Sequence, residues 1–172
     1  MNRIAILASG GGSNALKIME HFANSDVAEV AIVISNNSSA GVLGKAESFN
    51  VPTHIHSMEE LNNGQLLNVL IENSADFIVL AGYLKKISPD IVEHFDGRIV
   101  NIHPALLPDY GGKGMYGMNV HKAVVADGRT ESGMTIHYVN NNYDEGNIIL
   151  QKKFQLSAAD TPVMVAIIVL PL

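Results

Sequence analysis

Short apolar runs alternate with amphipathic segments along the first hundred residues of the chain. One run, Asp76–Ala81, is apolar without interruption after its first residue, which is typical of a parallel strand covered on both faces. The predicted strands are Arg3–Ala8, Val27–Ser35, Pro52–His56, Asp76–Ala81 and Arg98–His103. Strands that alternate with helices require crossover connections. The pattern therefore predicts an α/β fold with a Rossmann-like, mostly parallel sheet and helices on both faces.

Four helices are predicted between these strands. We expect Ser13-Asn14 to cap the first helix and Ser38-Ser39 to cap the second, because short polar side chains satisfy free N–H groups at helix starts. Leu61–Asn73 has the pattern of one continuous helix. Ser88 followed by Pro89 predicts an N-cap with proline in the first helical position.

The second half of the chain has a different pattern. Pro104–Asn119 is rich in glycine and proline and predicts a long ordered loop, followed by a helix over Val120–Ala126. Glu131–Val139 alternates in polarity and predicts a strand. The polar loop 140–146 separates it from a last strand, Ile148–Leu156, which we expect to be antiparallel at the edge of the sheet.

The end of the sequence is unusual. Thr161-Pro162 predicts a helix start, but Val163–Leu170 is almost wholly apolar and Pro171-Leu172 follows it. We expect 161–172 to be an atypical, truncated terminus. With 172 residues, the chain has the size of a single domain.

Composition narrows the classes of function. The net charge is −6 and no cluster of Lys or Arg exceeds two in a row, so no nucleic-acid footprint is predicted. There is no cysteine, which excludes disulfides and thiolate chemistry. We find neither a secretory leader nor an apolar run of membrane length, so we expect a cytoplasmic protein without a membrane partner.

The strongest candidate chemistry lies at the end of the strand Arg98–His103. Side chains two apart share a strand face, so Asn101 and His103 point the same way at the carboxyl edge, where open α/β sheets bind ligands. An amide beside an imidazole suits reaction at a carbonyl carbon, where negative charge develops on oxygen. A lone histidine is more often structural, but the flanking sequence here favours a functional role.

The first strand ends in a glycine-rich turn, Gly10-Gly11-Gly12-Ser13-Asn14-Ala15, which fits G-x-G-x-x-A. Such a turn directs backbone N–H groups and a helix N-terminus at an anion. A dinucleotide site also needs an acid after the second strand, and Ser35-Asn36-Asn37 has none. A single phosphate monoester therefore suits the turn better. The alternative is a tight turn before a capped helix.

Three further groups are candidates. Asp144 in the polar loop either reaches His103 and stabilises its imidazolium, or is an ordinary turn residue. His137 shares a strand face with Thr135, and we expect a buried, hydrogen-bonded histidine. Lys85-Lys86 meets a substrate carboxylate or lies in a solvated loop.

No metal site is predicted. His54 and His56 share a strand face, but no Asp or Glu accompanies them. There is no G-x-S-x-G motif for a nucleophilic serine.

Several motifs occur in an order that is specific to one family. They are Ala8–Asn14, Leu80–Tyr83, Asn101–Pro108 (NIHPALLP), Tyr110–Gly117 (YGGKGMYG), Ser132–Val139 and Tyr143–Gly146. Through them the chain resembles the phosphoribosylglycinamide formyltransferases, folate-dependent enzymes of purine synthesis, from residue 1 to about Pro162. The resemblance implies transfer of a formyl group from 10-formyltetrahydrofolate to the amine of glycinamide ribonucleotide, without a metal.

The resemblance also implies roles for individual residues. Catalytic roles fall on Asn101, His103 and Asp144. It implies that the substrate phosphate is bound by Gly11, Gly12, Ser13 and Asn14, and that Gly82 and Pro104 make other contacts with the substrate. The residues that it implies for folate binding are Leu84, Lys85, Ile87, Asn140, Asn141 and Asp144. Residues 1–100 would then form the phosphate-binding half and 101–160 the catalytic and folate-binding half.

Two features depart from the family pattern and keep alternatives open. The family carries an acid in its C-terminal helix that helps to hold the amine, and no Asp or Glu follows Asp160 here. No arginine precedes Leu61 in a position to bind a folate carboxylate, so Lys85 is the substitute candidate. The alternatives are a formyltetrahydrofolate deformylase or another formyltransferase, and a non-catalytic nucleotide- or folate-binding module. The expected partners are small-molecule substrates, and the oligomeric state is left open.

Overall fold

The computed structural model describes residues 1–169, which divide into two compact units at the boundary between Ile99 and Val100. The first unit contains parallel strands and the helices that connect them. The second contains antiparallel strands and two helices. The predicted α/β class, with parallel strands first and an antiparallel arrangement in the C-terminal half, is confirmed.

The first unit is built on four parallel strands in the order β3-β2-β1-β4. Their bounds are β1 Asn2–Leu7, β2 Ala28–Ser35, β3 Thr53–Ile55 and β4 Phe77–Leu80. Ile6, Ile34 and Ile78 have no exposed surface, as expected when both faces of a parallel strand are covered. Because the four strands are parallel, their carboxyl ends lie at the same edge of the sheet, and β1 runs into the glycine-rich turn there.

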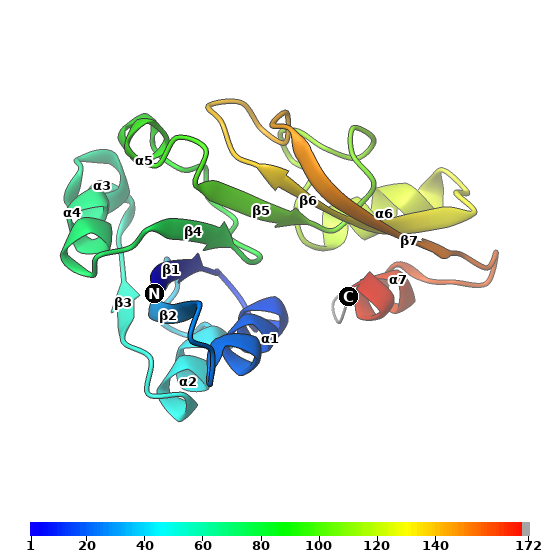
Figure 1. Cartoon of the computed structure of the whole chain (residues 1–172). Helices are drawn as coiled ribbons and strands as arrows, with labels where there is room; N and C mark the ends of the chain where they lie inside the picture. Colours follow the sequence, from blue (N-terminus) through cyan, green and yellow to red (C-terminus); the bar gives the residue numbers. More distant parts are fainter. Residues whose placement is uncertain (170–172) are drawn as a thin grey trace. The chain divides into compact units, whose positions relative to one another are not determined.

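The helices of this unit follow from the strand order. They are α1 Ser13–Phe22, α2 Gly41–Ser48, α3 Met58–Asn62, α4 Gln65–Glu72 and α5 Pro89–His94. Successive right-handed crossovers from β1 to β2 to β3 place α1 and α2 together on one face (Figure 1). The chain then returns past β1 to β4, so α3 and α4 lie on the opposite face (Figure 1).

The predicted helix over Leu61–Asn73 is wrong, because the chain forms two short helices there. α3 begins after Ser57, whose hydroxyl accepts a hydrogen bond from the Glu60 N–H at 3.1 Å. Gly64 then adopts φ +84°, a left-handed conformation that ends one helix and precedes the next. The apolar spacing alone does not report this break.

Two of the predicted caps are also wrong. α1 is preceded by Gly12 rather than capped by Ser13, and α2 is preceded by Ala40. The hydroxyl of Ser39 instead donates to Asn37 Oδ1 at 2.8 Å, within the turn before α2. Ser88 does occupy the N-cap position of α5 before Pro89, but its side chain makes no capping hydrogen bond.

The second unit is an antiparallel sheet in the order β5-β6-β7. Its elements are β5 Ile99–His103, α6 Met118–Ala126, β6 Glu131–Tyr138, β7 Ile148–Gln155 and α7 Pro162–Val169, with β5 belonging to this unit from Val100 onward. Met134 and Val165 form a buried core between β6 and α7. The register pairs Asn101 with His137 and His103 with Thr135, which places all four on one face of the ladder.

α7 begins where the sequence predicts. Thr161 Oγ1 accepts a hydrogen bond from the Met164 N–H at 3.4 Å, and Pro162 is the first helical residue. Val163 and Ile167 are exposed on this helix, as its nearly uniform apolar composition requires. The last part of the predicted apolar stretch, from residue 170 onward, lies outside the described residues.

Among residues 1–169, no helix has both the length and the apolar character that crossing a bilayer would need.

Candidate active site

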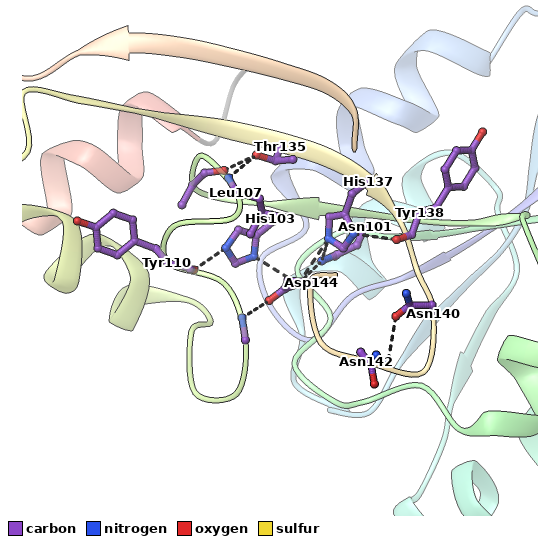
Figure 2. Close-up of polar contacts among 12 residues, drawn as sticks. Asn101, His103, Leu107, Tyr110, Thr135, His137, Tyr138, Asn140, Asn142 and Asp144 are labelled. Atoms are coloured by element: carbon purple, nitrogen blue, oxygen red, sulfur yellow. Dashed lines mark hydrogen bonds and ion pairs between the residues drawn. The ribbon is translucent and has the colours of Figure 1, made fainter. Parts of the chain in front are cut away.

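Asn101 and His103 lie on the same face of β5, as the strand period predicts (Figure 2). The His103 side chain is only 4% exposed, whereas Asn101 is partly buried. The Asn101 Nδ2 donates to His137 Nε2 at 3.1 Å and, over a longer distance of 3.4 Å, to Asp144 Oδ1. The amide therefore divides its two N–H donors between an imidazole and a carboxylate.

Asp144 reaches this cluster from the loop between β6 and β7 (Figure 2). Its Oδ1 lies 3.7 Å from His103 Nδ1 and 3.5 Å from His137 Nε2. Its other oxygen, Oδ2, accepts a hydrogen bond from the Gly112 N–H at 2.9 Å. Asp144 also has φ +53°, a left-handed conformation that Asp and Asn adopt more readily than most other side chains. One carboxylate thus faces three side-chain nitrogens.

His137 is the one member of the cluster that the sequence did not place in the site. It is buried, with Nδ1 donating to the Tyr138 carbonyl at 2.9 Å and Nε2 facing the Asn101 amide. The available signal was its shared strand face with Thr135, which indicated a buried, hydrogen-bonded histidine. Its position beside Asn101 follows only from the β5–β6 register.

The orientation of the His103 ring is fixed by the loop that follows β5. Its Nε2–H donates to the Tyr110 carbonyl at 2.8 Å (Figure 2). A nitrogen that donates to a carbonyl carries the proton in the neutral ring, so Nδ1 bears the lone pair. Nδ1 is therefore the nitrogen of His103 that can gain or lose a proton beside Asp144.

The electrostatics favour a neutral His103 beside an ionised Asp144. Burial lowers the pKa of His103, and the charge of Asp144 and the hydrogen bond to Tyr110 oppose that change without cancelling it. Burial acts to raise the pKa of Asp144, but the adjacent His137 and His103 rings and the hydrogen bond from the Gly112 N–H outweigh it, so this pKa lies below its usual value. Asp144 thus favours the imidazolium, as expected, but burial has the larger effect on His103.

Thr135 and Gln151 hold the chain just after His103. The Thr135 hydroxyl, which is fully buried, donates to the Ala105 carbonyl at 2.6 Å and accepts from the Leu107 N–H at 3.1 Å. Gln151 Nε2 donates to Thr135 Oγ1 at 3.0 Å and to the Leu107 carbonyl at 2.8 Å. These bonds satisfy buried backbone groups that no sheet neighbour reaches, and they fix where the loop leaves β5.

The glycine-rich turn belongs to the first unit. Gly12 has φ +69°, and a Cβ there would lie 2.5 Å from Val42 Cγ2, so only glycine fits. No side chain caps α1, which leaves N–H groups of its first turn available to an anion. Ser9 supports the turn from β1, because its hydroxyl donates to Asn36 Oδ1 at 2.5 Å and accepts from the Leu84 N–H at 2.9 Å.

The remaining predicted residues are placed within their own units. Gly82, Leu84 and Lys85 are exposed in the first unit, whereas Ile87 is only 5% exposed and presents little side-chain surface to a ligand. In the second unit Pro104 is partly buried, and Asn140 and Asn141 are exposed in the loop that carries Asp144. The substrate and folate roles of all these residues stay predictions.

Within the described part of the chain, no group of three or more His, Asp or Glu side chains is arranged to hold a metal ion.

Sequence comparison places the chain in a known family. Residues 2–167 match the family described as Formyl transferase, and the chain belongs to that family. It is 42% identical over 167 residues to the chloroplastic phosphoribosylglycinamide formyltransferase of Arabidopsis thaliana, with 93% of this chain and 57% of that protein covered. It is 35% identical to the phosphoribosylglycinamide formyltransferase of Haemophilus influenzae, with 94% of this chain and 76% of that protein covered.

Solved structures agree with the fold. The crystal structure of the phosphoribosylglycinamide formyltransferase of Anaplasma phagocytophilum is 31% identical and superimposes with a TM-score of 0.89, covering 98% of this chain and 78% of that one. The chain spans little more than half the length of the two plant relatives, 57% of the Arabidopsis thaliana protein and 53% of the Vigna unguiculata protein.

Proposed function

We propose that this chain transfers a formyl group from 10-formyltetrahydrofolate to the amine of glycinamide ribonucleotide. The observation that carries the proposal is the meeting of Asn101, His103 and Asp144, in which an N–H donor, a neutral imidazole and an ionised carboxylate face one another. Relatives that cover most of this chain are named phosphoribosylglycinamide formyltransferases, which supports the choice of substrates.

The first step is attack of the substrate amine on the formyl carbon. A C–N bond forms and the carbonyl π electrons move to oxygen, so the tetrahedral intermediate carries an oxyanion. We assign Asn101 Nδ2 as a donor to that oxygen, since its 3.4 Å bond to Asp144 is the weaker of its two and is the one most easily exchanged. A donor of this kind is typically worth about 3 kcal/mol of transition-state stabilisation.

The second step moves a proton from the attacking nitrogen to the leaving nitrogen. His103 Nδ1, which bears the lone pair, accepts that proton directly or through a water, and Asp144 at 3.7 Å stabilises the imidazolium. The same nitrogen then returns the proton to N10 of the folate as the C–N10 bond breaks. The products are formylglycinamide ribonucleotide and tetrahydrofolate, with no net change in the protonation of His103.

The binding roles belong to the same proposal. We assign the ribonucleotide phosphate to the turn Gly11–Asn14, because its backbone N–H groups and the uncapped start of α1 favour an anion. We assign folate binding to residues of the segment 84–87 and of the loop 140–144. A cytoplasmic location and the absence of a nucleic-acid partner stay predictions, and the Arabidopsis thaliana relative is named chloroplastic.

A single-turnover assay tests the function. Enzyme in excess over 10-formyltetrahydrofolate is mixed with and without glycinamide ribonucleotide, and formate and formylated ribonucleotide are measured. We expect formyl loss only with the ribonucleotide present, and equal formation of its formylated product. Loss as formate without the ribonucleotide would identify a hydrolase. Binding of both ligands without any formyl loss would identify a non-catalytic module. Either of these results overturns the proposal.

A further inference from the structure

One short turn, Tyr110–Gly112, contacts both His103 and Asp144 through its backbone. The Tyr110 carbonyl accepts the hydrogen bond from His103 Nε2 at 2.8 Å, and the Gly112 N–H donates to Asp144 Oδ2 at 2.9 Å. Between them, a Cβ on Gly111 would lie 3.2 Å from Asp144 Cβ, so the turn packs closely on the carboxylate-bearing residue. A shift of this turn would change the His103–Asp144 geometry directly.

Part of the space beside this turn is a cavity rather than packed side chains. A cavity of about 200 Å³ lies against it, lined by residues of the turn, of β6 and of β7. Leu107, Pro108 and Tyr110 form one wall of this cavity, and Ser132 and Gln151 belong to the other elements. Tyr110 moreover has φ +56°, an unfavourable conformation for a bulky side chain, so other interactions must keep it there.

A polar network supplies those interactions. The Tyr110 hydroxyl donates to Asp127 Oδ2 at 2.8 Å and accepts from Arg129 Nε at 2.8 Å. Arg129 Nη2 bonds Asp109 Oδ2 at 2.6 Å, and the guanidinium carbon lies 5.4 Å from the centre of the Tyr110 ring. Asp127 ends α6 and Arg129 precedes β6, so the network ties the turn to two fixed elements of the same unit.

We propose that Tyr110 and Arg129 are positioning residues, which hold the turn so that its carbonyl keeps His103 protonated on Nε2 with Nδ1 facing Asp144. Neither side chain touches the reacting groups, and both act through the Tyr110 backbone. The expected effect on kcat rests on the proposed function. The expected effect on the His103 tautomer rests only on the contacts within this unit.

The test uses Tyr110→Phe, which removes one hydroxyl, and Arg129→Gln, which removes the guanidinium. The exposed Tyr116→Phe in the same loop is the matched control. Nitrogen NMR of the imidazole rings reports which nitrogen of His103 carries the proton. We expect the Nε2–H form to lose population in both variants and to stay unchanged in the control. We also expect the pKa of His103 to fall further, because the Tyr110 hydrogen bond and the charge of Asp144 raise it, whereas burial and the neighbouring His137 lower it.

Kinetics give the second measurement. We expect kcat to fall about three- to tenfold in each variant with both KM values unchanged, and the double variant to be little worse than either single one, because Arg129 acts through the Tyr110 hydroxyl. An unchanged His103 tautomer in both variants overturns the positioning role. If the tautomer changes in the variants but the unmodified protein itself shows no formyl transfer, the positioning role is supported and the proposed function is overturned.

Discussion

Replacing Asn101 by alanine separates catalysis from binding. The change removes both Nδ2 donors, one to His137 and one to Asp144. Loss of a single oxyanion donor costs about 3 kcal/mol, or roughly 10²-fold in kcat. The free energy of unfolding should fall as well, by about 1–3 kcal/mol, because the buried His137 Nε2 loses its partner.

Single-turnover rates at saturating concentrations of both substrates measure the catalytic effect, and equilibrium titration with the ribonucleotide alone measures affinity. Asn62→Ala, an identical truncation at the exposed end of α3, controls for the general effect of removing an asparagine. We expect the rate to fall about 10²-fold and the ribonucleotide Kd to stay within about twofold. A Kd that weakens by the same factor as the rate would refute the oxyanion role, since the amide would then bind ground state and transition state equally.

Three further outcomes follow from the same geometry. Asp144→Asn removes the charge that opposes burial at His103, so we expect the His103 ionisation in the pH–rate profile to move to lower pH and kcat to fall about 10²-fold. Burial lowers the pKa of His121 and His103 from 6.5, so the unfolded chain binds more protons below about pH 6.5 and stability should fall as pH falls through that range. In urea titrations His121→Gln should make that slope shallower by up to about 1.4 kcal/mol per pH unit. Gly146→Ala places a Cβ against the Tyr138 carbonyl, so thermal unfolding should show a loss of more than about 2 kcal/mol.

Hydrophobic period was sufficient to predict the strands but not the helix boundaries. The parallel strands are short, continuous apolar runs, which their burial on both faces requires. The errors all involve turns. Gly64 and Gly12 adopt positive φ, where glycine replaces the side-chain cap that the neighbouring serines or the helical pattern suggested. Such positions depend on backbone geometry, and apolar spacing carries no information about it.

For the candidate site, the sequence predicted the two residues that lie together on one strand, but it did not predict the residue that a neighbouring strand brings to them. Asn101 and His103 share a face by the period of β5 alone. The approach of His137 depends on the register between β5 and β6, and the long connection between these strands, which contains α6, does not fix that register in the sequence. The neutral state of His103 depends on how deeply the folded chain buries it, which no local pattern reports.

The left-handed backbone at Asp144 restricts how that position can be varied. Apart from glycine, Asp and Asn are the side chains that tolerate such a φ best, so asparagine removes the charge while leaving the chain path intact. Alanine or glutamate there would disturb the main chain as well, and a loss of activity in either could not be attributed to the carboxylate. A mutational scan that uses only alanine would therefore overestimate how much the Asp144 carboxylate itself contributes to activity.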